Sequence, residues 1–143
     1  GLLGRAIKAA QQKGILIVAA VGNDGPAAPP RYPAAYKGVI GVTGVDLRER
    51  ALPEAGIATP VDFAAPGAGI KGASPDGKLV GLRGTSFAAP LVAARLLSYY
   101  PTANISQIEA AVNGLIREAK DLGKKGPDKI YGNGLICAKC GIR

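Results

Sequence analysis

Two short stretches of the sequence carry the residue types that acyl-transfer chemistry needs. Residues 83–90 read RGTSFAAP, which places Ser86 directly before a run of small apolar residues. The first turn of a helix has backbone N–H groups without intrahelical partners, and the helix dipole is positive there. A serine in that turn can therefore attack a carbonyl group while the backbone holds the oxyanion that forms. The alternative is a plain helix cap, in which Thr85 or Ser86 does no chemistry.

The second stretch is VAAVGNDG, residues 18–25, in which an apolar run ends at Gly22 and Asn23. Ligand chemistry in open α/β sheets gathers at the carboxyl ends of strands. An asparagine at such an end can donate its amide N–H to the same oxyanion that the backbone amide of Ser86 would hold. A turn residue that tolerates a left-handed backbone is the alternative interpretation of Asn23. The chemical hypothesis requires the two residues to converge in space.

The elements that must position these residues follow from hydrophobic periodicity and turn residues. Seven consecutive apolar residues over 15–21 predict a strand buried on both faces, as in a parallel sheet. We expect a single α/β unit, residues 1–143, with a mainly parallel sheet flanked by helices. The predicted order is a helix ended by Gly14, strands over residues 15–21, 39–45 and 61–67, a hairpin within 69–84, a helix from Ser86 to the residue before Pro101, and a helix after Asn104.

The helix after Asn104 has clear local signals. Asn104 followed three residues later by Gln107 predicts a capping box. Apolar residues at helical spacing predict the buried stripe of this helix, namely Ile105, Ile108, Val112, Leu115 and Ile116.

Composition limits the other functions that this chain could have. Its net charge is +8, but aromatic residues make up only 5% and no long run of like charges occurs, which favours a solvated surface over a nucleic-acid interface. No apolar run approaches the roughly 20 residues that span a bilayer. Cys137 and Cys140 lack the further soft ligands of a zinc site, so a local disulfide or two idle thiols is the favoured interpretation. We expect no metal among the catalytic residues.

Five stretches together resemble the subtilisin-like serine proteases, the subtilase family. VAAVGNDGP resembles the oxyanion-asparagine motif of that family, and GTSFAAPLVAA resembles its catalytic-serine motif. RYPAAYKGVIGVTGVD resembles the segment after the substrate pocket, VDFAAPGAGI resembles the Ala-Pro-Gly turn, and YGNGLI resembles the closing turn. The stretches follow the order and spacing of the family over nearly all of the 143 residues. The resemblance implies a three-layer subtilisin-like fold, of which only the C-terminal part is present.

The resemblance also implies a role for each site residue. Ser86 would be the nucleophile of a serine endopeptidase, and its backbone amide would form the oxyanion hole with Asn23. Gly22, Gly84 and Thr85 would contact the polypeptide substrate. No cofactor is required. The family pattern places a cis peptide bond at Tyr32–Pro33 and allows a structural calcium ion in the parent protein. The parent would be extracellular or periplasmic.

The residues that activate the serine are missing from this sequence. It contains no histidine, and in the family the aspartate and the histidine precede the segment that this chain resembles. The chain has no methionine and opens inside a helical pattern, so we expect the serine-bearing half of a catalytic domain, inert without its upstream half. Strand 15–21 would then expose an unpaired edge, which predicts a homo-oligomer or strand exchange. The alternative function is a catalytically dead subtilase-like domain used for binding.

Overall fold

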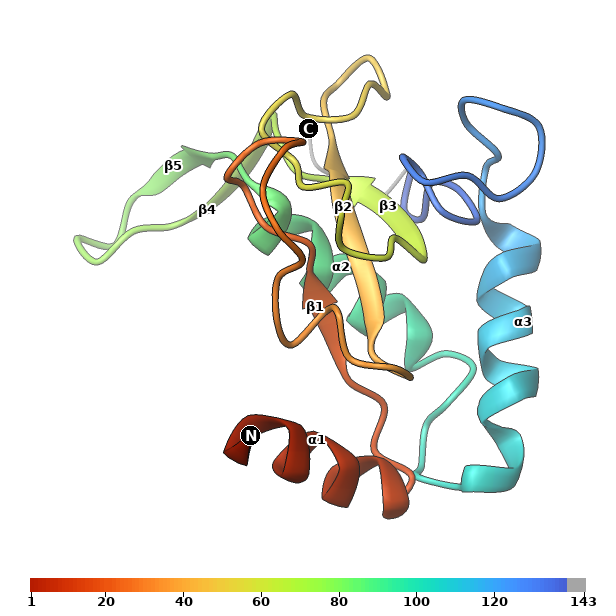
Figure 1. The fold of residues 1–143 in the computed structure, drawn as a ribbon. Coiled ribbons are helices and arrows are strands. Elements are labelled where there is room, and N and C mark those ends of the chain that lie inside the picture. The colour runs from red at the N-terminus through yellow and green to blue at the C-terminus, as the bar shows by residue number, and fades with distance from the viewer. Residues whose placement is uncertain (139–143) are drawn as a thin grey trace.

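The structure, a computed structural model, describes residues 1–138 and consists of a small parallel sheet with helices on both of its faces (Figure 1). The elements in chain order are α1 (Leu2–Gln12), β1 (Val18–Ala20), β2 (Ile40–Val45), β3 (Phe63–Pro66), β4 (Ile70–Ala73), β5 (Leu79–Leu82), α2 (Thr85–Leu96), the 3₁₀ turn η1 (Ile105–Gln107) and α3 (Ile108–Glu118).

The parallel sheet has the strand order β1-β2-β3, so β2 is its central strand. Val42 illustrates the register, since it lies opposite Ala20 of β1 and Phe63 of β3. All six residues of β2 are buried, as the run of apolar and small residues predicts. Gly41 has no room for a side chain, because a Cβ there would lie 2.1 Å from the carbonyl oxygen of Pro60.

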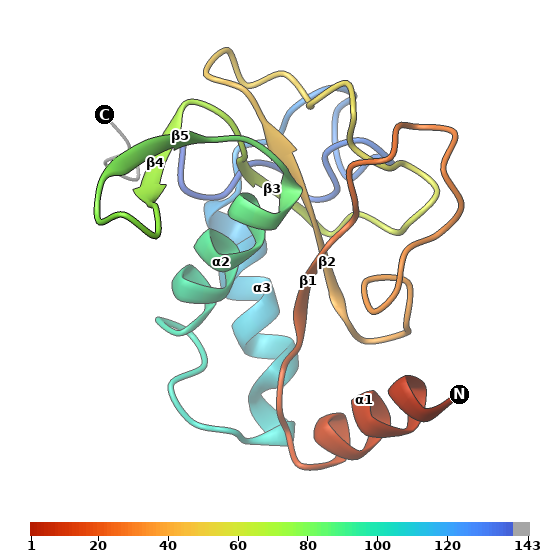
Figure 2. The same ribbon diagram turned by 90° about the vertical axis from the view of Figure 1, so that its left-hand side faces the viewer.

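The side chains of the sheet alternate between two helical layers. Val18 and Ala20 of β1 pack on the side of α2, in the core cluster that also holds Val92 and Leu115. Ala19 faces the opposite side and packs with Ile7 of α1. Figure 2 shows the same arrangement, with α1 on one side of the sheet and α2 and α3 on the other. The prediction of a sheet flanked by helices is therefore confirmed.

Local turn signals predicted two elements well. Gly14 ends the first helical segment with φ +75°, a backbone conformation that suits glycine. The hairpin of β4 and β5 is antiparallel, pairs Ile70 with Leu82 and turns at residues 74–77. In Figure 1 this hairpin projects away from the body of the molecule, directly before α2.

The prediction for strand 15–21 is wrong in its length and in its burial. The strand β1 has only three residues, although hydrogen bonds from Ile40 N–H to the Ile17 carbonyl and from Val21 N–H to the Val42 carbonyl extend the pairing. Ile15 is 47% exposed. Ile15 lies before β1, outside the paired residues. The strand β1 pairs with β2 alone within the described residues, which agrees with the expectation of an unpaired edge. An apolar run does not reveal which strands flank it.

The predicted capping box after Asn104 does not form. Asn104 Oδ1 accepts hydrogen bonds from Ser106 N (3.1 Å) and Ser106 Oγ (2.7 Å) instead of the backbone N–H of Gln107. A 3₁₀ turn intervenes, and α3 begins after Gln107. The turn shifts the helical face, so that Ile105 is 58% exposed whereas Leu115 is fully buried.

Candidate functional site

The end of β1 and the start of α2 meet at the carboxyl edge of the sheet. Gly22, which follows the buried Val21, has φ +102° and begins the turn that carries Asn23. The turn is tied to a neighbouring loop, because Gly56 N–H donates to the Gly22 carbonyl at 3.1 Å. Asn23 is exposed at the outer end of this turn. The sequence predicted this place for Asn23 from the apolar run that precedes it.

Asn23 caps the helix α2 from 62 positions away in the chain. Gly84, the residue at the cap position, has no side chain that could accept a hydrogen bond, and its φ of +140° favours glycine. Asn23 Oδ1 accepts the hydrogen bond from the backbone N–H of Thr85 instead, at 2.8 Å. This bond provides an acceptor for one of the backbone N–H groups that have no intrahelical partner at the start of a helix. The bond also fixes the orientation of the carboxamide, so the Nδ2 group of Asn23 can donate to another acceptor.

Ser86 lies in the first turn of α2 with an exposed side chain. The amides on either side of it are occupied, since Thr85 N–H donates to Asn23 and Phe87 N–H donates to the Gly84 carbonyl at 3.2 Å. Among the residues that the structure describes, the N–H of Ser86 has no acceptor. An exposed hydroxyl thus stands beside an open backbone donor at the positive end of a helix.

Two further predicted residues, Gly84 and Thr85, are buried beneath this surface. Thr85 is 0% exposed, and its Oγ1 has no hydrogen-bond partner within the described residues. Its backbone holds Asn23, so it positions the carboxamide whether or not it touches a substrate. The prediction that Gly22, Gly84 and Thr85 contact substrate stays a prediction.

Charged side chains line both sides of this arrangement, and sequence reasoning missed them. Arg83, which precedes Gly84, donates to Glu54 Oε1 from Nε at 2.6 Å and to Oε2 from Nη2 at 2.9 Å. The side-chain hydrogen bonds from Arg83 lower the pKa of Glu54 below its ordinary value. Arg31 pairs with Asp24, next to Asn23, at 2.5 Å. No local sequence signal marks these pairs. Arg83 and Glu54 are far apart in the sequence, and only tertiary folding brings them together.

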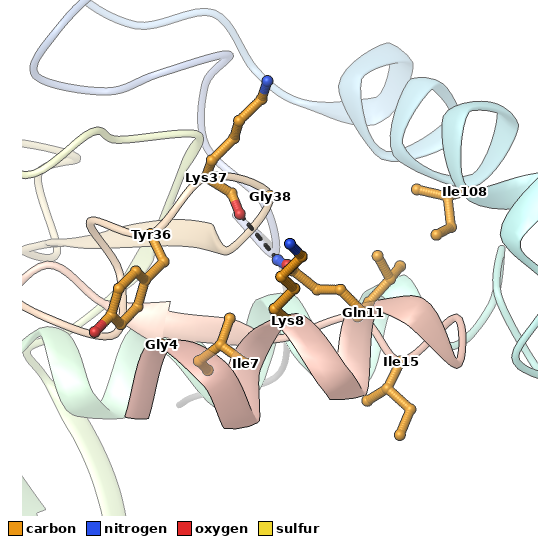
Figure 3. A pocket seen from close by; sticks show the side chains of 10 residues that line it. Gly4, Ile7, Lys8, Gln11, Ile15, Tyr36, Lys37, Gly38 and Ile108 are labelled. Atoms are coloured by element: carbon orange, nitrogen blue, oxygen red, sulfur yellow. Dashed lines mark hydrogen bonds between the residues drawn. The ribbon is translucent and has the colours of Figure 1, made fainter. Parts of the chain in front are cut away.

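A cavity of about 520 Å³ lies at the opposite edge of the sheet (Figure 3). Ile15 and Gly38, which line it, precede β1 and β2, so it opens at the amino ends of the strands. Ile7 and Tyr36 give it apolar walls, and the side-chain amide of Gln11 is bonded to the Lys37 carbonyl at 2.9 Å. The cavity therefore does not belong to the site at Ser86.

Other expectations can be compared with the described residues only in part. The peptide bond between Tyr32 and Pro33 is cis. Within residues 1–138 no three His, Cys, Asp or Glu side chains gather as a metal site, and structural calcium stays a prediction. Cys137 is not a free thiol, whereas Cys140 lies outside the described residues. In this part of the chain no helix combines the length and the apolar character that crossing a membrane requires.

The structure thus defines an α/β protein in which an exposed serine lies in the first turn of a helix and an asparagine from a strand end holds the start of that helix. The model of the subtilase family matches residues 2–134. The chain belongs to the subtilase family.

Known relatives and solved structures agree with this assignment. Subtilisin DY of Bacillus licheniformis is 36% identical over 140 residues, which cover 94% of this chain and 49% of that protein. Thermitase of Thermoactinomyces vulgaris is 36% identical over 139 residues, which cover 96% of this chain and 45% of that protein. The chain therefore spans about half the length of these relatives.

Among solved structures, the prenylagaramide maturation protease PagA aligns with a TM-score of 0.70 and 27% identity, over 94% of this chain and 52% of that one. A lanthipeptide protease aligns with a TM-score of 0.76 over 95% of this chain and 52% of that one, and at 23% identity it supports the fold alone. The fold is a partial subtilisin-like α/β fold, as the sequence predicted.

Proposed function

We propose that this chain is the serine-bearing part of a subtilisin-like endopeptidase that hydrolyses peptide bonds through an acyl-enzyme on Ser86. One observation carries the proposal: the open N–H of Ser86 and the fixed carboxamide of Asn23 flank an exposed hydroxyl. Membership of a family whose members include subtilisins supports it. A helix cap alone would not require the serine to be exposed.

The proposed reaction begins when Ser86 Oγ attacks the carbonyl carbon of the substrate. The carbonyl oxygen becomes an oxyanion, which accepts hydrogen bonds from Ser86 N–H and from Asn23 Nδ2. Because Thr85 N–H holds Asn23 Oδ1, the donor is oriented before the substrate arrives, and little reorganisation is needed during the reaction. The C–N bond then breaks, the amine leaves with the proton of the serine, and water hydrolyses the resulting ester.

The base that takes the proton of the serine must come from outside these 143 residues. The sequence contains no histidine, and Ala89 occupies the third position after Ser86, where a serine–lysine arrangement would place its lysine. A serine hydroxyl is a poor nucleophile without an adjacent base. We therefore propose that the aspartate and histidine belong to the upstream part of the parent protein and that the isolated chain is inactive. Polypeptides are the proposed substrates.

The proposed location of the parent is extracellular. One relative, 34% identical over 141 residues, is the minor extracellular protease Epr of Bacillus subtilis. The match covers 94% of this chain but 21% of that protein, so the location is carried over as part of this proposal.

Labelling with a fluorophosphonate tests the proposed function, because this reagent phosphonylates an activated serine. We expect the parent protein to be labelled and its Ser86→Ala variant to remain unlabelled. Ser98→Ala is the matched control, since Ser98 is also exposed and lies just beyond the far end of α2. A parent that folds but is not labelled would overturn the enzyme proposal and favour a binding domain.

A further inference from the structure

One loop, residues 52–56, contacts both of the stretches that form the proposed oxyanion site. The loop follows β2 and is tied to that strand, because Leu52 N–H donates to the Gly44 carbonyl at 3.0 Å. The side chains of Leu52 and Ala55 are buried and pack with Ala68. The core therefore sets the position of this loop.

The backbone of the loop holds the turn of Asn23 at both ends. Before Asn23, the Gly22 carbonyl accepts a hydrogen bond from Gly56 N–H at 3.1 Å. After Asn23, Gly25 N–H donates to the carbonyl of Glu54 at 2.8 Å. Gly22 and Gly25 both have positive φ, at +102° and +92°, where glycine is the residue with the most conformational freedom. The two bonds to the loop therefore restrict a turn that its own sequence leaves flexible.

The side chain of Glu54 holds the second stretch through Arg83. Nε and Nη2 of Arg83 donate to the two carboxylate oxygens of Glu54 at 2.6 Å and 2.9 Å. Two parallel hydrogen bonds of this kind fix the orientation of the groups as well as their distance. Arg83 lies between the end of β5 and Gly84, the cap position of α2. The pair therefore ties the start of α2 to the same loop that holds Asn23.

The chain that leads into α2 comes from an exposed part of the molecule. The hairpin of β4 and β5 projects from the body of the protein in Figure 1, and residues 79–81 of β5 are exposed. The hydrogen bonds from Arg83 lower the pKa of Glu54 below its ordinary value, so the carboxylate is charged throughout the neutral pH range. The pair is therefore present under the conditions in which Ser86 would react.

We propose that Glu54 is a positioning residue that sets the distance between the two oxyanion donors, Asn23 Nδ2 and Ser86 N–H. This inference rests on the proposed function. Glu54 acts on Asn23 through its backbone and on Ser86 through Arg83, without touching the substrate. A displaced donor stabilises the oxyanion less well, because such donors act by being placed in advance. The oxyanion forms only after the substrate is bound, so the loss should affect kcat and not KM.

The test measures kcat and KM of the parent enzyme with a chromogenic peptide anilide. Glu54→Gln should lower kcat by about 3- to 10-fold and leave KM unchanged, because glutamine offers Arg83 one acceptor oxygen and no charge. Arg83→Gln should cause the same loss, and the double variant should lose no more than either single variant, because both residues act through one pair. A raised KM with an unchanged kcat would assign the pair to substrate binding and overturn the proposal.

A second comparison asks whether Glu54 acts through the oxyanion site. In an Asn23→Ala background the Nδ2 donor is already absent, so adding Glu54→Gln should lower kcat by less than about 2-fold. If Glu54→Gln lowers kcat by the same factor with and without Asn23, its effect is independent of the oxyanion donors and the proposal is wrong.

Glu118→Gln is the matched control. Glu118 accepts hydrogen bonds from Nε and Nη2 of Arg95, at 2.7 Å and 2.8 Å, and this pair lies at the other end of α2. The Glu118→Gln variant should keep the kcat of the wild type. An unchanged kcat in both Glu54→Gln and Arg83→Gln, in a parent that fluorophosphonate labels, overturns the role of Glu54 and leaves the proposed function standing. An unlabelled parent overturns both.

Discussion

The hydrogen bond between Asn23 and Thr85 allows stability and catalysis to be separated by two substitutions at one position. Asn23→Ala removes both the acceptor for Thr85 N–H and the donor for the oxyanion. Asn23→Asp keeps an oxygen at the place of Oδ1 but loses the Nδ2 donor. Both variants should be poor catalysts, but only the alanine variant should be less stable.

The expected change in stability follows from the geometry. The 2.8 Å bond caps the first amide of α2, and loss of such a cap costs roughly 0.5–2 kcal/mol in the free energy of unfolding. Asn23→Asp retains the bond and places a negative charge at the helix start, which stabilises by about 0.3–1 kcal/mol. The aspartate variant should therefore be at least as stable as the wild type at neutral pH.

The expected change in turnover has the same sign for both variants. In subtilisin, removal of an oxyanion-hole donor lowers kcat by about 10²- to 10³-fold. The kcat of the Asn23→Asp variant should fall at least as far, because its carboxylate would repel the oxyanion.

Urea unfolding and single-turnover acylation of the parent protein measure the two effects separately. An Asn23→Asp variant that acylates within a few-fold of the wild-type rate would refute the role of Nδ2. An Asn23→Ala variant with unchanged stability would refute the capping of α2 by Asn23.

Two further predictions concern the fold. Burial raises the pKa of Asp62 despite the hydrogen bond that Gly41 N–H donates to its carboxylate at 2.7 Å. The native state therefore holds the proton of Asp62 more tightly than the unfolded state does. As a result, the free energy of unfolding falls as the pH rises from the ordinary pKa of an aspartate through the raised pKa of Asp62. Asp62→Asn, which can still accept that bond, should therefore raise the urea midpoint at neutral pH and change it little in acid; a lower midpoint at neutral pH would contradict this. The isolated chain should self-associate through the edge of β1 that is unpaired within residues 1–138, as measured by sedimentation equilibrium, and a monodisperse monomer that unfolds cooperatively would count against that.

The elements around the site were predictable because their signals are local. The positions of Ser86 and Asn23 follow from a glycine turn before an apolar helix and from an apolar run before a glycine turn. The resemblance to subtilases then joined the two stretches, which neither periodicity nor spacing could do alone. The structure adds the bond through Thr85, whose partner is 62 residues distant and leaves no trace in the local sequence.

The remaining differences have physical reasons of the same kind. The run over residues 15–21 is apolar enough for a central strand, but burial depends on the strands beside it, and β1 has one neighbour within the described residues. The side chain of Asn104 can accept a hydrogen bond from the backbone N–H of either Ser106 or Gln107, and in the 3₁₀ turn it accepts from Ser106.

A crystal structure of the parent protein with a fluorophosphonate adduct on Ser86 tests the central claim most directly. The phosphoryl oxygen should lie within about 3 Å of both Ser86 N and Asn23 Nδ2, with Asn23 Oδ1 still bonded to Thr85 N–H. A phosphoryl oxygen that points away from Asn23, or an adduct on a different residue, would contradict the assignment of this oxyanion site.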